Sequence, residues 1–231
     1  MIGAIVQGSF IDGSFNQYLY HQINDVNVIN RVTKTCMKSA FIHETVVSLP
    51  VKERKNFIGS VIGGSSKFAA ITPEQINSSK NYFTNDKSVL DGLHQAAVQN
   101  GFDHIVRVYG DSPILPSWLI GDAVREYFKR TGEVVTTRDN FPEGFTVDVF
   151  PFWMLAEAYT YQDGREDFDI EGFPTFQLSN DTNIDKNLDF QFKNLEQAEL
   201  FDSILTSMDN GHDIIDILGD IVDINEEDIK E

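Results

Sequence analysis

Cysteine is nearly absent from this 231-residue chain, which contains Cys36 and no other. A disulfide bond within the chain is therefore excluded, and so is a zinc site built on several thiolates. Cys36 falls on an apolar position of a helical pattern. Buried positions of that kind favour a structural thiol over a reactive one.

Long hydrophobic runs and basic charge are also scarce. No apolar stretch approaches the length that spans a membrane, and none follows a basic N-terminal region, so we expect a cytoplasmic protein without a membrane partner. The 18 Lys and Arg face 36 Asp and Glu, for a formal net charge of −18. Such a surface repels nucleic acid and anionic lipid, which leaves a small-molecule enzyme or a protein-binding partner.

Apolar patterns along the chain alternate between strand and helix periods. We expect strands at 2–6, 45–49, 104–109, 133–137 and 146–150, and helices at 26–40, 86–100, 117–130, 151–161 and 195–208. This order is typical of an α/β fold with a three-layer, mostly parallel, Rossmann-like sheet. We expect residues 1–208 to form this domain and residues 209–231 to form an acidic amphipathic helix and tail, docked on the body or on a partner.

Ligands of parallel sheets sit beyond the carboxyl ends of strands, and two segments satisfy that rule. One is the loop after Val6 and the other is the turn at 110–113, where Asp111 follows a strand end. The preceding Gly110 lets the backbone turn sharply. A carboxylate there can hold a divalent cation such as Mg²⁺, although an aspartate in a G-D-x-P turn can also bond only its own backbone.

Residues 89–115 read VLDGLHQAAVQNGFDHIVRVYGDSPIL. This segment resembles the polysaccharide-biosynthesis (spore-coat type) cytidylyltransferases, which are related to the acylneuraminate and KDO cytidylyltransferases. In that family a helix leads to a strand ending in R-x-x-G-D-x-P-L. Further likeness lies in PEGFTVDVF at 142–150, similar to P-x-G-x-x-V-E-V-F, in Arg165-Glu166, similar to the start of R-E-H-V, and in Ile5-Val6-Gln7, similar to I-I-Q-A-R.

The resemblance implies a nucleotide-diphosphosugar transferase fold. It also implies attack by an oxygen of an acidic sugar on the α-phosphate of CTP, with release of pyrophosphate. The roles it implies are catalysis by Asp111 and Arg107 with Mg²⁺ on Asp111, nucleotide binding by Gln7, Gly8, Ser9, Gly13, Ser14 and Gly110, and sugar binding by Glu143, Gly144, Asp148, Arg165 and Glu166. Arg107 and Gly144 equally fit structural roles, as half of a salt bridge and as a turn residue, and a homodimer is left open.

The chain also departs from the family pattern. The family's opening loop, R-x-x-S-x-R-x-P-x-K, carries three cations where this chain has Ser9, Ser14 and Tyr18. The late D-x-P-x-D segment, which supplies a second metal carboxylate in the family, reads KNLEQ here, with Lys193 in place of the acid. Because phosphoryl transfer depends on electrostatic stabilisation, two interpretations stay open. One is a divergent enzyme with a relocated phosphate clamp, and the other is a catalytically decayed homologue that binds a nucleotide, a sugar or a protein. A glycosyltransferase that uses the related fold is a third, weaker interpretation.

Overall fold

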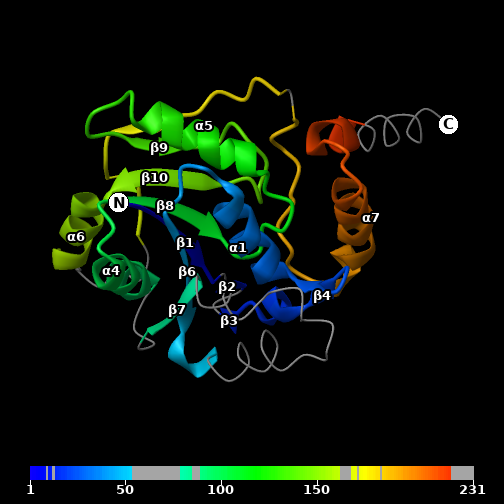
Figure 1. Ribbon diagram of the computed structural model, residues 1–231, viewed down its shortest axis with the longest axis horizontal. Coiled ribbons are helices and arrows are strands. Elements are labelled where there is room, and N and C mark those ends of the chain that lie inside the picture. The colour runs from blue at the N-terminus through cyan, green and yellow to red at the C-terminus, as the bar shows by residue number, and fades with distance from the viewer. Residues whose placement is uncertain are drawn as a thin grey trace.

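A mixed sheet lies at the centre of the protein (Figure 1). The computed structural model describes residues 1–8, 10–11, 14–53, 79–84, 89–161, 168–170, 172–182 and 184–219. Within these residues the sheet has seven strands in the order β11 (Thr175–Gln177), β9 (Val134–Thr136), β10 (Val147–Pro151), β8 (His104–Tyr109), β1 (Ile2–Gln7), β6 (Glu44–Pro50) and β7 (Ser79–Thr84). All neighbouring pairs are parallel except those of β10, which runs against both β8 and β9.

Helices cover both faces of the sheet and make three layers. Helices α1 (Val28–Lys38) and α5 (Ser117–Tyr127) pack on one face, and α4 (Val89–Asn100) and α6 (Phe152–Thr160) on the other. Helix α7 (Ala198–Asp209) packs against β4 (Gln22–Ile23), which pairs with β5 (Val26–Asn27). The remaining elements are β2 (Phe10–Ile11), β3 (Ser14–Phe15), η1 (Gln17–Tyr20), η2 (Val51–Glu53) and η4 (Leu195–Gln197). The predicted α/β class, mostly parallel and three-layered, is confirmed.

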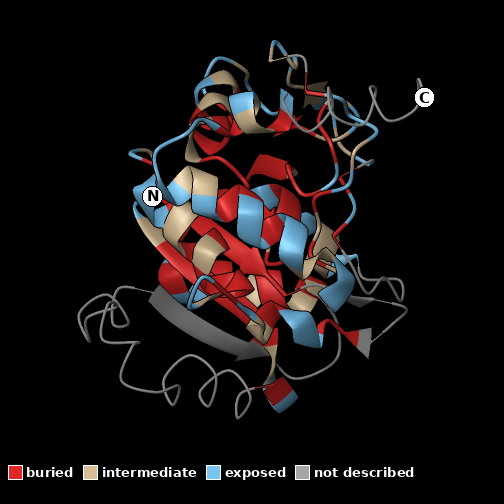
Figure 2. Cartoon of the chain, turned by 90° about the vertical axis from the view of Figure 1, so that its right-hand side faces the viewer, coloured by how far each residue is buried: buried red, intermediate tan, exposed pale blue. Residues whose placement is uncertain are grey.

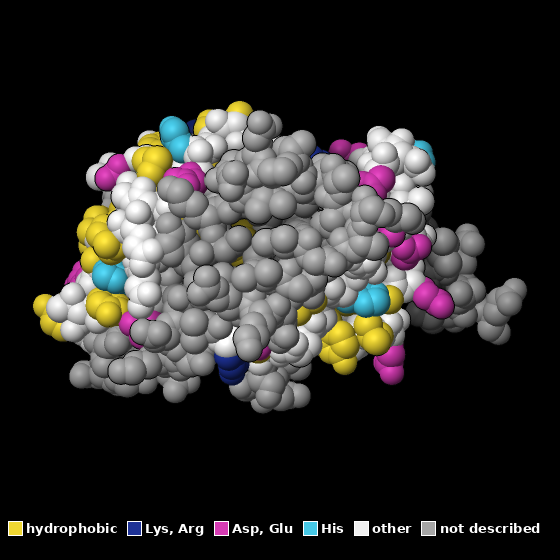
Figure 3. All heavy atoms as spheres, turned by 60° about the horizontal axis from the view of Figure 1, so that its bottom comes forward, with side chains coloured by type: hydrophobic (Ala, Val, Ile, Leu, Met, Phe, Trp, Pro, Cys, Tyr) yellow, Lys and Arg dark blue, Asp and Glu magenta, His cyan; other side chains and the backbone are white. Residues whose placement is uncertain are grey.

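Strand alternation divides the core into two parts, one on each face of the sheet. In β1, Ala4 and Val6 join the cluster under α1 and α5, while Ile5 joins the cluster under α4. Figure 2 shows that buried residues predominate in the described strands of the sheet. Gly3 is required by this packing, because a Cβ there would lie 2.2 Å from the ring of Phe102. On the face in Figure 3 the described charged side chains are mostly acidic.

The predicted elements agree with the structure to within a few residues where the apolar pattern is strong. The strand at 104–109 has its predicted bounds, and the predicted helix at 195–208 is a short 3₁₀ turn followed by α7. Strand β11 was missed, because Thr175–Gln177 lies in a stretch that reads as a polar excursion. Residues 214–219 are helical, with Ile214 and Leu218 buried in the main core cluster. No helix among the described residues is both long and apolar enough to cross a membrane.

Candidate functional site

The carboxyl ends of β1 and β8 form the edge of the sheet where the candidate site lies. Gln7 is paired with Tyr109 across the two strands, and the amide of Gly110 donates a hydrogen bond to the carbonyl of Gln7 at 2.8 Å. A Cβ at Gly110 would lie 3.2 Å from that carbonyl oxygen, so the close approach favours glycine. The opening segment and the turn that bears Asp111 therefore meet, as parallel strands predict.

Three segments distant in the sequence are tied together at Asp111. The amide of Phe192 donates to the carbonyl of Asp111 at 2.7 Å, and the side-chain amide of Asn16 donates to the carbonyl of Phe192 at 3.0 Å. The His21 ring also stacks on the ring of Phe192. The end of the opening loop, the Asp111 turn and the late segment around Lys193 thus converge.

Buried polar groups gather at this edge. Asp111 is 4% exposed, Gln7 is 5% exposed and Ser112 is fully buried. Neither Gln7 Oε1 nor Ser112 Oγ has a hydrogen-bond partner within the described parts of the chain. Polar atoms that lack partners in a protein interior are costly, so both are candidates for contact with a polar ligand.

Arg107 and Asp148 form a buried ion pair between β8 and β10, where they lie directly opposite each other. The Nε and Nη2 atoms of Arg107 donate to Asp148 Oδ2 at 2.9 and 2.7 Å, and Nη1 donates to the carbonyl of Phe168 at 2.8 Å. Both side chains are 0% exposed. This burial favours the salt-bridge alternative for Arg107 over catalysis, and it separates Asp148 from any contact with a sugar.

A second arginine shares the same carboxylate. Arg138, just after β9, donates to Asp148 Oδ1 and Oδ2 at 3.2 and 3.0 Å and to the Tyr109 hydroxyl at 3.0 Å. The hydroxyl of Thr136 donates to Asp148 Oδ1 at 2.7 Å. Burial alone would raise the pKa of Asp148, but the charges of Arg107 and Arg138 and the bond from Thr136 outweigh it and lower that pKa. Two arginines therefore bond the same buried carboxylate.

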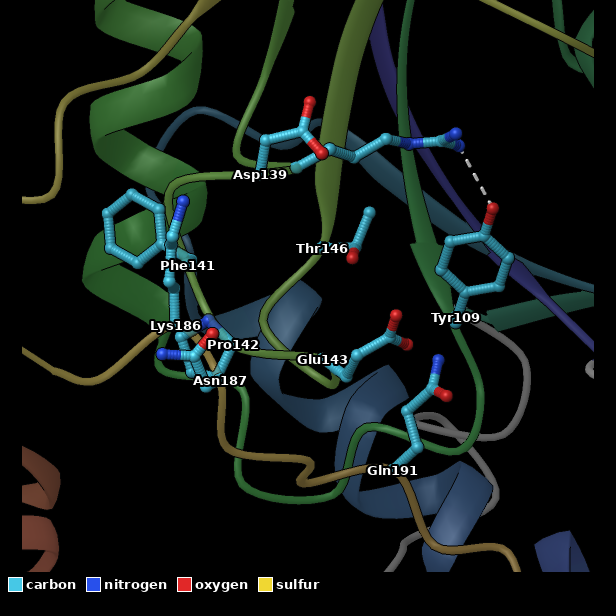
Figure 4. A pocket seen from close by; sticks show the side chains of 10 residues that line it. Tyr109, Asp139, Phe141, Pro142, Glu143, Thr146, Lys186, Asn187 and Gln191 are labelled. Carbon is cyan, nitrogen blue, oxygen red and sulfur yellow. Dashed lines mark hydrogen bonds between the residues drawn. The ribbon is translucent and has the colours of Figure 1, made fainter.

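A pocket of about 500 Å³ opens beside this cluster. It is lined by Tyr109, Arg138, Asp139, Phe141, Pro142, Glu143, Thr146, Lys186, Asn187 and Gln191. Figure 4 shows the side chains of Glu143 and Gln191 reaching into the space beside Tyr109, with the bond from Arg138 to the Tyr109 hydroxyl dashed. Arg138 and Lys186 bring positive charge to the pocket wall, and Asp139 and Glu143 bring negative charge to it.

Glycine is required at 144 by a crossing of two segments at the base of the pocket. Gly144 has φ of +89°, and a Cβ there would lie 2.5 Å from the carbonyl of Phe190. The amide of Phe190 in turn donates to the carbonyl of Glu143 at 2.8 Å. Gly144 thus fits the turn role left open above, while Glu143 is placed on the pocket wall.

Several predicted site residues are not among those that the structure describes. Ser9, Gly13, Arg165 and Glu166 lie outside the described residues, as does the side chain of Ser14. Sequence reasoning missed Tyr109, Arg138, Lys186, Asn187 and Gln191 on the pocket wall. Arg138 had a usable signal, because it follows the end of a predicted strand just as Asp111 does.

Asp111 is the carboxylate that the sequence predicts as a ligand of a divalent cation at the carboxyl end of β8. Within the described ranges no group of three or more His, Cys, Asp or Glu side chains could hold a metal ion. Mg²⁺ usually keeps several waters and is held by one or two carboxylates together with substrate phosphates. Asp111 fits that limited role as a single carboxylate beside a phosphate.

The fold is of the nucleotidyltransferase-like α/β class, and the carboxyl ends of β1 and β8 lie together at one edge of its sheet. No protein-family model and no curated protein matches the chain. Among solved structures, a cytidylyltransferase from Leptospira borgpetersenii is similar with a TM-score of 0.73 and 16% identity, over 98% of this chain and 95% of that one.

Two further solved structures share the architecture. The 2-C-methyl-D-erythritol 4-phosphate cytidylyltransferase of Thermus thermophilus has a TM-score of 0.58 and 12% identity, over 88% of this chain and 98% of that one. A CMP:2-keto-3-deoxy-manno-octonic acid synthetase, solved with CTP, has a TM-score of 0.54 and 11% identity, over 90% of this chain and 98% of that one. At these identities the likeness shows that the chain has the fold these cytidylyltransferases adopt.

Proposed function

We propose that this protein is a cytidylyltransferase, which joins the cytidylyl group of CTP to an acidic sugar used in glycan or polysaccharide synthesis. The observation that carries the proposal is the pairing of Gln7 with the Gly110–Asp111 turn, at the ligand edge of a fold that cytidylyltransferases share. An oxygen of the acceptor attacks the α-phosphate of CTP, a new phosphorus–oxygen bond forms, and pyrophosphate leaves. A cytoplasmic location and a homodimer remain part of the proposal.

The polar groups at the β1–β8 edge suit the nucleotide half of this reaction. Gln7 and Gly8 lie at the end of β1, where Gln7 Oε1 is a buried oxygen without a hydrogen-bond partner among the described residues. Asp111 would hold Mg²⁺ together with triphosphate oxygens. Bound there, the cation would neutralise charge that builds on the phosphates.

The neighbouring pocket suits the acceptor half. Its volume of about 500 Å³ accommodates a sugar, and Glu143, Thr146 and Gln191 offer groups that bond hydroxyls. Arg138 and Lys186 on the pocket wall favour an acceptor that bears a carboxylate or a phosphate.

Release of pyrophosphate tests the proposal. The protein, Mg²⁺ and CTP are incubated with a panel of acidic sugars, and ATP, GTP and UTP serve as competing nucleotides. Asp111→Asn should reduce turnover at least 100-fold, while Asp202→Asn, an exposed position on α7, should leave it unchanged. Turnover that survives in Asp111→Asn, or the absence of turnover with every nucleotide and acceptor, would contradict the proposal. Binding of CTP without turnover would instead support the decayed homologue.

A further inference from the structure

Burial alternates along the late segment of the chain that passes the site. Phe190 and Phe192 are 4% and 0% exposed, whereas Asp189, Gln191 and Lys193 are partly or fully exposed. Gln191 lines the pocket, and its side chain reaches toward that of Glu143 (Figure 4). The alternation of buried and exposed side chains places Asp189 and Lys193 on the same outward side of this segment as Gln191, which is the one of the three that lines the pocket.

The backbone of Lys193 is held beside Asp111 from two directions. On one side, the preceding Phe192 amide bonds the Asp111 carbonyl at 2.7 Å. On the other, the amide of Lys193 donates to Gln197 Oε1 at 2.8 Å, within a capping box formed by Asn194 and Gln197. The ammonium group of Lys193 is therefore joined by four methylene groups to a backbone position that is held next to the Asp111 turn.

The charge partner of Lys193 is one that a phosphate can replace. Its ammonium lies 2.7 Å from Asp189 Oδ2, with side chains 39% and 44% exposed. Exposed pairs of this kind contribute little to stability. A triphosphate carries several negative charges, so it can draw the ammonium away from Asp189 at small cost.

We propose that Lys193 is a phosphate-binding cation of this site, contacting the triphosphate beside Asp111. It supplies a positive charge that the opening segment lacks, and it does so from the position where the resembling family has a metal-binding acid. The inference rests on the proposed function and adds a catalytic residue to it. Asp189 keeps the ammonium in place when no nucleotide is bound.

Affinity for CTP and for inorganic tripolyphosphate tests the role without requiring an acceptor. Lys193→Gln should weaken both by at least tenfold in titration calorimetry, while Lys193→Arg should keep most of the affinity. Asp189→Asn should tighten both about two- to fivefold, because it removes a competing anion, and added salt should shrink that gain. The control is Lys129→Gln, which breaks a similar exposed ion pair, with Glu126 on α5, and should leave affinity unchanged.

The outcomes separate the inference from the function on which it rests. Thermal melting confirms that each variant is folded before its affinity is compared. A wild-type protein that releases pyrophosphate, together with Lys193→Gln that binds CTP within twofold of it, overturns the role of Lys193 alone. A wild-type protein that binds neither CTP nor tripolyphosphate overturns both the role and the function.

Discussion

Replacing Asp148 with asparagine removes a buried carboxylate that Arg107 and Arg138 both bond. The change breaks the ion pair of Arg107, which is 0% exposed, and it weakens the bonds from Thr136 and Arg138. Breaking a buried pair by removal of one partner costs about 3–5 kcal/mol. Because domains of this size are stable by about 5–15 kcal/mol, Asp148→Asn should lose about a fifth or more of the free energy of unfolding in urea titrations.

The pH dependence follows from the lowered pKa of Asp148. A carboxyl whose folded-state pKa lies below its unfolded value contributes stability above the unfolded pKa, and that contribution is lost as the pH falls through the folded pKa. The difference between wild type and Asp148→Asn should therefore be full at pH 7 and shrink in acid. Asp139→Asn, a nearby exposed carboxylate, should change stability by less than about 0.5 kcal/mol. A loss below about 1 kcal/mol in Asp148→Asn at pH 7 would refute this account of the cluster.

Two further predictions concern packing. Gly144→Ala should lose about 2–4 kcal/mol in the same titrations, because it combines backbone strain at φ +89° with a contact to the Phe190 carbonyl, whereas Gly132→Ala, with open space around it, should lose only about 1 kcal/mol. Equal losses at the two positions would contradict the crossing at Gly144. Burial raises the pKa of Cys36 to about 12, so a thiol reagent at pH 8 should label the unfolded protein and leave the folded one unlabelled. Rapid stoichiometric labelling of the folded protein would contradict that burial.

The part of the site that could be predicted from sequence is the part that local pattern determines. Strands β1 and β8 are short apolar runs, each followed at once by polar residues and glycine, so their ends and the position of Asp111 could be predicted. Parallel pairing then places the end of β1 next to Gly110, because the carboxyl ends of parallel strands lie at one edge.

The partner of Arg107 could not be predicted, although a salt bridge was one of the alternatives, because the partner depends on the register between two strands. Asp148 lies opposite Arg107 only because β10 pairs with β8 in one particular register. No pattern in the sequence close to either residue indicates that register. The same holds for Gly144, whose turn matters because Phe190, 46 positions later, crosses it. Strand β11 has three residues, which is too short for an alternating apolar pattern to show in the sequence, and it joins the sheet by pairing with β9.

The reversed direction of β10 has a consequence for how this molecule could diversify. Because β10 runs against its neighbours, the chain that joins β9 to it leaves and re-enters the sheet at one edge, and it carries Arg138, Phe141, Glu143 and Thr146 along the pocket. Gln7, Gly110 and Asp111 belong to other connections. A graft of this short connection between homologues would exchange one wall of the cavity and leave the strand ends beside Asp111 in place, so acceptor choice could be redesigned separately from nucleotide use.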